Sequence, residues 1–283
     1  MNTTKIEWVR NIDGSQGYTL NPVKGKCPVA CSYCYARRLY DRFKWNPEIR
    51  MDFYLMPEQV CPIINPSRIF VGSTIELFGD WIKKDWLEHI FDMARYFKQH
   101  TFIFLTKQPQ NLIKWSPFPE NCWVGVSVTN RKQLQDLSKY FDSPVGGGGI
   151  RAKVKFISIE PLLEPIVCHH EWIDISHKPN IRSRVMPINV CSKCGKSMNW
   201  QDNTGFIGIN GKPMFQWVII GQQTPVKKAT TPKVEWIREI VEACDKAGIP
   251  VFLKDNLKPL FPIPYINQMW GKDKLRQEFP NIK

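Results

Sequence analysis

The chain has 283 residues, of which 43% are hydrophobic, and a formal net charge of +13 at neutral pH. This length allows a substantial core, and we expect one main domain. No apolar run approaches the roughly 18 residues that span a bilayer, and the N-terminus is charged, so we expect no membrane anchor, no export signal and a cytoplasmic protein.

The positive charge comes from 39 basic against 26 acidic side chains. Such an excess favours a polyanionic partner such as nucleic acid over a neutral metabolite. Enzymes that act on phosphorylated small molecules are also often basic, so charge alone does not choose the substrate.

Strand-like and helix-like segments alternate along the chain. Strands are expected at 17–23, 68–73, 101–106, 122–128, 152–159, 216–221 and 249–254. Helices are expected at 35–43, 81–98, 110–115, 131–141 and 233–247. This alternation predicts an α/β fold with a mostly parallel, buried sheet.

One long segment interrupts the alternation. Residues 165–216 lack a strong helical period and lie between two expected core strands. A connection of this length implies its own structure or a functional lid. We therefore divide the chain into a main domain, 1–164 with 217–283, and an inserted subdomain, 165–216.

Three cysteines, Cys27, Cys31 and Cys34, follow the first expected strand in the sequence KCPVACSYCYARR. Three thiolates can hold an iron–sulfur cluster and leave one iron open, but they cannot close a four-ligand site. Structural zinc is the alternative, although it usually takes four protein ligands. The spacing therefore favours a 4Fe–4S cluster with a non-protein fourth ligand.

The inserted subdomain contains a second group of possible metal ligands. Cys191 and Cys194 form a C-x2-C-G turn that resembles a zinc knuckle, and Cys168 with His170 can complete four ligands. His169 is an alternative to His170, and the sequence does not choose between them. A second iron–sulfur cluster and unliganded thiols are the other interpretations.

The helix expected after the cysteines carries Arg37, Arg38 and Arg42 among aromatic residues. Cations mixed with stacking rings suit a nucleic-acid or nucleotide substrate. A solvated basic helix is the other interpretation.

The C-x3-C-x2-C spacing resembles the signature of the radical S-adenosylmethionine (radical SAM) superfamily. Most of the chain also resembles the phage Gp37/Gp68-like family of radical SAM proteins, in phrases that include NPVKGKCPVACSYCYA, FVGSTIELFGDW, FIFLTKQP and FISIEPLLEPI. This resemblance implies a partial (β/α)6 barrel, a location in the bacterial or phage-infected host cytosol, and an electron donor such as flavodoxin or ferredoxin.

The resemblance also implies site residues. The cluster would lie on Cys27, Cys31 and Cys34, and S-adenosylmethionine would bind its open iron and lie against Tyr33. Further cofactor contacts are expected from polar or glycine residues at strand ends: Gly72, Ser73, Thr74, Ser127, Glu160 and Gly221. Gly72–Ser73–Thr74 departs from the Gly-Gly-Glu common at this place in the superfamily.

The expected reaction is reductive cleavage of S-adenosylmethionine to a 5′-deoxyadenosyl radical, which modifies or repairs a nucleic-acid base or nucleotide. Two alternatives stay open from the sequence. One is a radical SAM enzyme that acts on a peptide or small metabolite, and the other is a non-enzymatic zinc/cysteine protein that binds nucleic acid. The oligomeric state and the hydrogen that is abstracted are not encoded in any motif.

Overall fold

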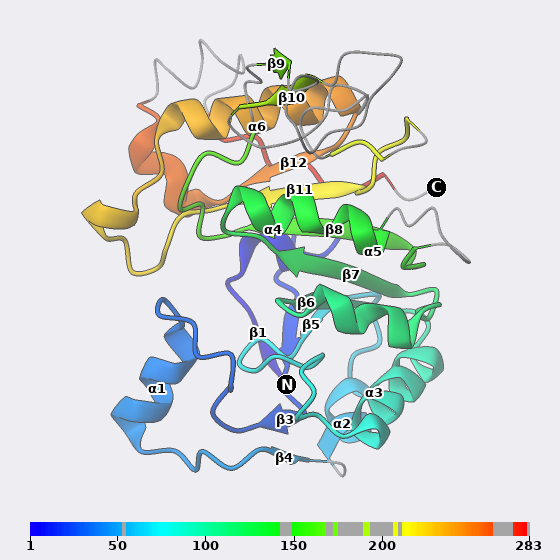
Figure 1. Ribbon diagram of the computed structural model, residues 1–283. Helices are drawn as coiled ribbons and strands as arrows, with labels where there is room; N and C mark the ends of the chain where they lie inside the picture. Colours follow the sequence, from blue (N-terminus) through cyan, green and yellow to red (C-terminus); the bar gives the residue numbers. More distant parts are fainter. Residues whose placement is uncertain are drawn as a thin grey trace, which may run out of the picture.

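The computed structural model describes residues 1–52, 55–141, 149–167, 172–174, 189–192, 206–208, 211–262 and 274–281. An eight-stranded sheet lies at its centre (Figure 1). Its strands in spatial order are β1 (Asn2–Thr3), β2 (Tyr18–Leu20), β5 (Arg68–Val71), β6 (Thr101–Thr106), β7 (Cys122–Ser127), β8 (Val154–Ile159), β11 (Trp217–Ile220) and β12 (Val251–Leu253).

The sheet is mostly parallel. Strand β1 pairs antiparallel with β2, and every other neighbouring pair is parallel. Each new parallel strand is added at the same edge, so the spatial order follows the sequence order. Right-handed crossovers then place most of the connecting helices on one face of the sheet. Seven parallel strands are present, as the sequence pattern predicts, one more than the six that the family resemblance implies.

The helices that cover this face are α3 (Lys84–Tyr96), α4 (Arg131–Asp136), α5 (Ser138–Phe141) and α6 (Val234–Ala247). Helix α1 (Tyr35–Phe43) lies apart from them (Figure 1), and α2 (Leu55–Val60) precedes β5. The 3-10 helices are η1 (Glu7–Val9), η2 (Pro109–Trp115), η3 (Lys228–Thr230) and η4 (Asp255–Leu260).

Side chains alternate across the sheet and form two packed layers. On β6, Phe102 and Phe104 pack with the helices, whereas Ile103 points to the opposite face. There it joins an aromatic cluster: Trp8, Phe70, Trp123, Phe156, Trp217 and Phe252. The face without helices is therefore also apolar and buried, as in a sheet that curves around its own interior.

Three predicted elements differ from the structure. The strand expected at 17–23 divides into β2 and β3 (Val23–Lys24), because Pro22 between them has no N–H for the ladder. Strand β3 pairs with β4 (Arg50–Met51) in a separate sheet. The helix expected at 131–141 is broken between α4 and α5, and the one at 110–115 is the 3-10 helix η2.

Part of the expected insertion lies among the described residues. Strands β9 (Trp172–Asp174) and β10 (Asn189–Cys191) pair with each other in a two-stranded sheet of their own. Phe206 and Phe215, by contrast, are buried in the core beneath the helices. The end of the 165–216 segment therefore packs into the main domain.

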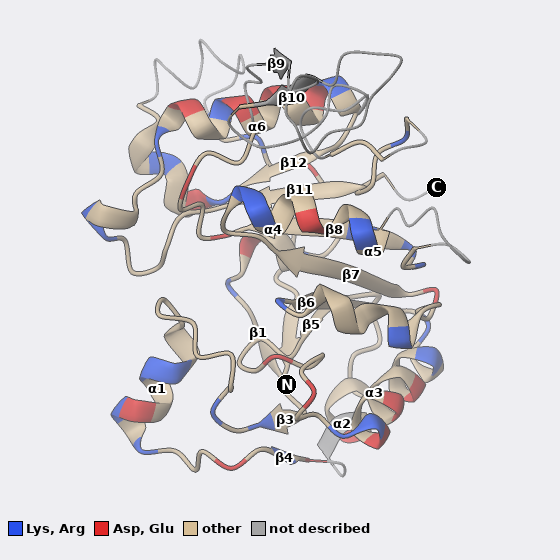
Figure 2. Ribbon diagram, in the orientation of Figure 1, with Lys and Arg blue, Asp and Glu red and all other residues tan. Residues whose placement is uncertain are grey.

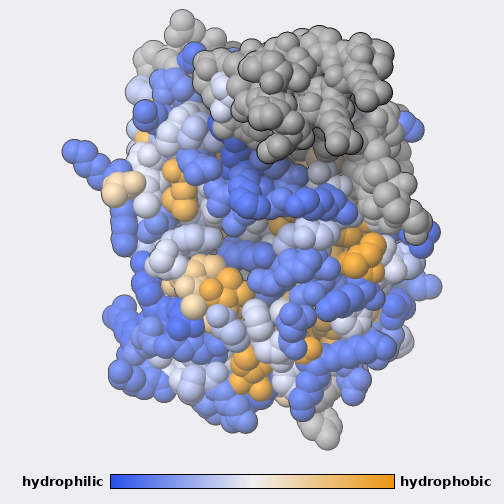
Figure 3. Space-filling model, in the orientation of Figure 1, coloured by the Kyte–Doolittle hydropathy of each residue, from blue (hydrophilic) through white to orange (hydrophobic). Residues whose placement is uncertain are grey.

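The face drawn in Figure 3 is mostly hydrophilic, with small and scattered apolar areas. In the part of the chain that the structure describes, no helix combines the length and apolar character needed to cross a membrane.

Candidate cofactor and substrate cavity

A cavity of about 650 Å³ lies where the parallel strands end. The residues that follow the strands line it: Gly72, Ser73 and Thr74 after β5, Lys107 after β6, Glu160 after β8, Gln223 after β11 and Lys254 after β12. The carboxyl edge of a parallel sheet is where α/β proteins usually bind ligands, because the loops there can vary without disturbing the core.

Cys27, Cys31 and Cys34 all line this cavity. They lie in the loop between β3 and α1, which turns sharply at Ala30 with a φ of 55°. The backbone N–H of Cys34 donates to the carbonyl of Cys31 at 3.1 Å, and Cys34 is the N-cap residue of α1. The loop therefore directs three thiols into one space.

The Cys27 side chain is partly buried from solvent. Burial raises the pKa of the Cys27 thiol, and backbone N–H groups of Glu76 and Val29 that point at its sulfur partly offset this effect. Hydrogen bonds to sulfur of this kind are common around iron–sulfur clusters, where they stabilise thiolate charge. Burial, together with the neighbouring Cys31, also raises the pKa of Tyr33.

The number and type of thiols in this loop are those that an iron–sulfur cluster would need, and whether the loop binds one stays a prediction. Among the described residues, no group of three or more His, Cys, Asp and Glu side chains is gathered closely enough to hold one metal ion. In a 4Fe–4S cluster each thiolate binds a different iron, so the sulfurs surround the cluster and do not meet at one point. Three thiols on one cavity wall fit that requirement in number and type.

The structure brings most of the predicted cofactor residues together. Tyr33, Ser127 and Glu160 line the cavity, as do the three residues from Gly72 to Thr74. Gly72 has a φ of +76°, and a Cβ there would lie 2.5 Å from the Leu77 side chain, so glycine is required at this turn. Gly221 lies just beneath Glu160 and Lys254.

Glu76 and Lys107 were not predicted as site residues. Glu76 lines the cavity and is 7% exposed. Burial raises its pKa, although Thr106 and two backbone N–H groups donate to its carboxylate. The Lys107 ammonium lies 5.7 Å from the centre of the Tyr33 ring. Lys107 directly follows a strand, so its position at a strand end was the available signal.

Ser158, Gln223 and Lys254 were also missed, and all three line the cavity. Ser158 is paired with Ser127 in the β7–β8 register, so the two hydroxyls share a face of the sheet. The strand alternation could have revealed Ser158, because it stands on the interior side with Phe156. Lys254 could be predicted as a cavity residue only from the position of β12 beside β11 in the sheet.

The three predicted substrate-binding arginines lie outside the cavity lining. Arg37 donates to the carbonyl of Cys27 at 2.7 Å, and Arg38 donates to the carbonyl of Thr224 at 2.9 Å. Arg42 lies 5.2 Å from the centre of the Phe43 ring. Arg37 and Arg38 thus help to attach α1 to the cavity rim, and substrate contact by any of the three stays a prediction.

The predicted zinc ligands cannot be placed. Cys168, His170 and Cys194, with the alternative His169, lie outside the described residues, and Cys191 is described only as part of strand β10. Zinc binding by the insertion therefore stays a prediction.

Comparison with known proteins gives a family but no activity. No curated protein and no solved structure matches the chain. The predicted resemblance to phage radical SAM proteins is therefore neither supported nor opposed by a relative of known function. Residues 3–258 match the family described as a protein of unknown function (DUF5131), and because this match covers most of the chain, the protein belongs to that family.

Proposed function

We propose that the protein is a radical SAM enzyme whose 4Fe–4S cluster is held by Cys27, Cys31 and Cys34. One observation carries the proposal: three cysteines from a single loop and the polar ends of the parallel strands line the same cavity. A closed structural zinc site would bury its ligands away from such a space, whereas a cluster with an open iron needs room for a second cofactor beside it.

The fold supports this proposal. Sequential parallel strands with helices on one face are the arrangement expected of a partial (β/α)6 barrel, although seven parallel strands are present here. The cavity at the carboxyl edge corresponds to the face on which such folds carry their active sites.

Bound together, the cluster and S-adenosylmethionine would supply one-electron cleavage of the sulfonium and so a radical that abstracts hydrogen from the substrate. The protein's own residues would hold and orient these two cofactors in the cavity. Tyr33 and Thr74 border the cysteine end of the cavity, and the Ser73 hydroxyl is fixed by a 3.1 Å hydrogen bond to Asn21. The carbonyl of Ser73 accepts from the Tyr35 hydroxyl, which fixes the same loop to α1.

The proposed substrate is a nucleic-acid base or nucleotide, and the electron would come from a flavodoxin or ferredoxin. The charge of +13 supports a polyanionic substrate. A peptide or small metabolite would be indicated if only such a compound stimulated cleavage of S-adenosylmethionine.

The test is anaerobic reconstitution with iron and sulfide, followed by iron analysis and assay of 5′-deoxyadenosine after addition of S-adenosylmethionine and a reductant. We expect about four irons per chain in the wild-type protein, the content of one 4Fe–4S cluster. Cys27→Ser, Cys31→Ser and Cys34→Ser should each lose the cluster and the product.

Cys61→Ser is the matched control, because Cys61 is an exposed free thiol that does not line the cavity. This variant should keep both iron and product formation. Wild-type protein that binds zinc but no iron at the loop would contradict the proposal, as would equal iron loss in Cys61→Ser.

A further inference from the structure

The end of the cavity that the last strands form is built differently from the end that the cysteine loop forms. Glu160 follows β8 and Lys254 follows β12, whereas the Gly72–Thr74 loop follows β5. Three strand spacings of about 4.8 Å, or about 14 Å, separate β5 from β8 in the sheet. Glu160 and Lys254 therefore come from strands other than β5, whose end forms the Gly72–Thr74 loop.

Glu160 and Lys254 form an ion pair there. The Lys254 ammonium lies 2.6 Å from a Glu160 carboxylate oxygen, and the two side chains are 15% and 23% exposed for Lys254 and Glu160 respectively. The strands that carry them are separated by β11, so the side chains meet above Gly221. A Cβ at Gly221 would lie 2.9 Å from Lys254 and 3.1 Å from Glu160, so glycine leaves room for the pair.

Two buried polar side chains beside this pair have unused hydrogen-bonding capacity. Ser158 is 2% exposed and Gln223 is 6% exposed, and both line the cavity. Among the described residues neither side chain makes a hydrogen bond, and neither is a fully buried unsatisfied group. Because both side chains reach the cavity surface, their polar atoms are available to a ligand there.

The cavity also has an aromatic floor. Trp8 and Phe70 both line the cavity, with their ring centres 4.9 Å apart. Trp8 also lies near Phe156 of β8 and Trp217 of β11, the strands that lead to Glu160 and Gly221. Aromatic rings and a charged pair in one cavity suit a flat ring that stacks on its faces and forms hydrogen bonds at its edge.

We propose that this end of the cavity is a nucleobase site that reads a lactam edge, the adjacent N–H and C=O of guanine, uracil or thymine. The Glu160 carboxylate accepts from the ring N–H, and the Lys254 ammonium donates to the neighbouring carbonyl. Adenine and cytosine lack this arrangement, because each has a ring nitrogen acceptor beside an amino group. Enzymes that act on bases commonly combine such edge contacts with stacking.

This inference deepens the proposed function, on which it rests for a nucleotide substrate, and it changes the predicted role of Glu160. Glu160 and Gly221 were expected to serve the cofactor, whereas here they belong to the substrate end. A carboxylate beside an ammonium would also suit the zwitterion of an amino acid, but the aromatic floor and the basic chain favour a base.

The test is calorimetric titration of the purified protein, under reducing conditions and without S-adenosylmethionine, with GMP, UMP, AMP and CMP. We expect GMP and UMP to bind at least about tenfold more tightly than AMP and CMP, the discrimination typical of one good pair of base contacts. Lys254→Met should weaken GMP and UMP binding by about tenfold or more.

Glu160→Gln should reduce the difference in binding affinity between GMP and AMP. The amide can donate as well as accept a hydrogen bond, so it no longer requires a ring N–H on the base. Gly221→Ala keeps both charged groups but displaces them, and should weaken GMP binding to an intermediate degree. Glu242→Gln and Lys258→Met are matched controls outside the cavity lining, and should bind as the wild type does. Thermal unfolding of each variant shows whether it is folded.

Equal affinity for the four mononucleotides would overturn this inference, and so would binding of a free amino acid with no binding of any nucleotide. The two proposals fail separately. Protein that forms 5′-deoxyadenosine but does not discriminate among the bases overturns the base site alone. Protein that discriminates among the bases but holds no iron overturns the radical SAM assignment alone.

Discussion

The Glu76 carboxylate joins the ends of two neighbouring strands. One oxygen accepts from the Thr106 hydroxyl at 2.6 Å and from the N–H of Phe78 at 3.0 Å, and the other accepts from the N–H of Lys107 at 2.7 Å. These bonds fix the loop after β5 against the end of β6. The position of Lys107 beside Tyr33 therefore depends on a buried acid that makes no direct salt bridge in the described structure.

Glu76→Gln should destabilise the protein by about 1–3 kcal/mol at pH 5, because the new amide group faces the N–H of Lys107 and leaves that donor unsatisfied. Burial raises the folded pKa of Glu76 above its usual 4.5. The stabilisation that the protonated Glu76 carboxyl gives the folded state is thus complete below pH 4.5. It is lost as the pH rises through the folded pKa. The difference in free energy of unfolding between wild type and Glu76→Gln should therefore become smaller from pH 5 to pH 8. Urea unfolding at several pH values measures it.

Glu120→Gln provides the control for this comparison, since Glu120 is exposed. Its free energy of unfolding should stay within about 0.5 kcal/mol of wild type at both pH values. A gap between wild type and Glu76→Gln that widens as the pH rises would contradict the argument from burial.

At the scale of elements, the N-terminal segment connects the two edges of the sheet. Strand β1 pairs with β2, and a few residues later a Glu7 carboxylate oxygen accepts from the N–H of Asp255, which follows β12, at 3.1 Å. Directly after Glu7, Trp8 enters the aromatic interior and is 3% exposed. The segment therefore fills the space between the first and last strands and forms one wall of the cavity.

Trp8→Ala should lower the free energy of unfolding by about 3–5 kcal/mol, the usual cost of removing a large buried aromatic side chain. Trp8→Phe should lose less, because it still contacts Phe70. Trp45→Ala is the matched control: Trp45 is 49% exposed, and its loss should cost much less. Equal losses for Trp8→Ala and Trp45→Ala in urea unfolding would show that the N-terminal segment is not part of the core.

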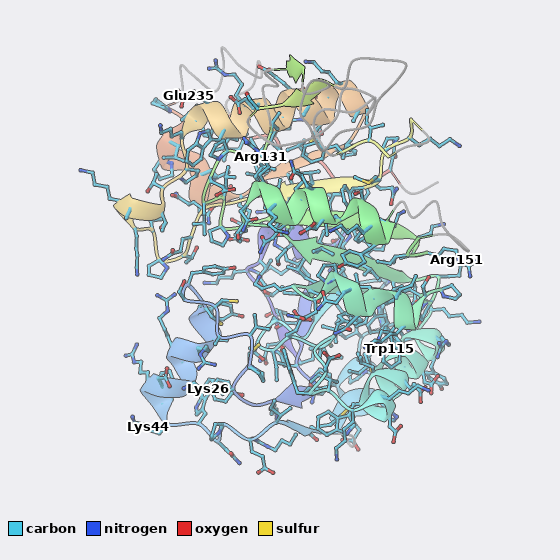
Figure 4. All side chains as sticks on the ribbon, viewed as in Figure 1. Lys26, Lys44, Trp115, Arg131, Arg151 and Glu235 are labelled. Atoms are coloured by element: carbon cyan, nitrogen blue, oxygen red, sulfur yellow. The ribbon has the colours of Figure 1, made fainter. Side chains whose placement is uncertain are left out.

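At the scale of the whole molecule, basic side chains are distributed over several elements and include a group at α1 (Figure 2). Lys26 and Lys44 lie at this end, far from Arg151 in the view of Figure 4. Phe43 and Trp45 stack with their ring centres 5.5 Å apart and are 52% and 49% exposed. Exposed rings beside cations suit single-stranded nucleic acid, whose bases stack while its phosphates pair with charge.

Arg42→Glu should therefore weaken binding of a single-stranded oligonucleotide and reduce the slope of log K against log salt by about 1, as expected when one phosphate contact is lost. Arg151→Glu makes the same change in net charge at an exposed position away from α1, and should leave the slope nearly unchanged. Titrations from low to moderate salt measure both slopes. Equal slope changes in the two variants would show that binding depends on net charge and not on the α1 surface.

The sequence by itself determined the alternation of strands and helices. The periodicity of hydrophobic residues, and the glycine and proline residues that end an element, depend only on neighbouring positions in the chain. Strand β6 and helix α1 have the predicted bounds. It also identified the cysteine loop and the polar ends of β5, β7 and β8, because motif spacing and strand termini are visible along the chain. The break at Pro22 was readable too, since a proline cannot donate to the ladder.

Only the tertiary structure decided which strand ends face one another. The Glu160–Lys254 pair joins residues 94 positions apart, and its geometry depends on β8 and β12 both lying beside β11. Likewise, Trp8 became an interior residue because the N-terminal segment crosses from β2 to the end of β12. Local patterns carry no information on such distant pairings, because strand order and burial follow from how the whole sheet packs.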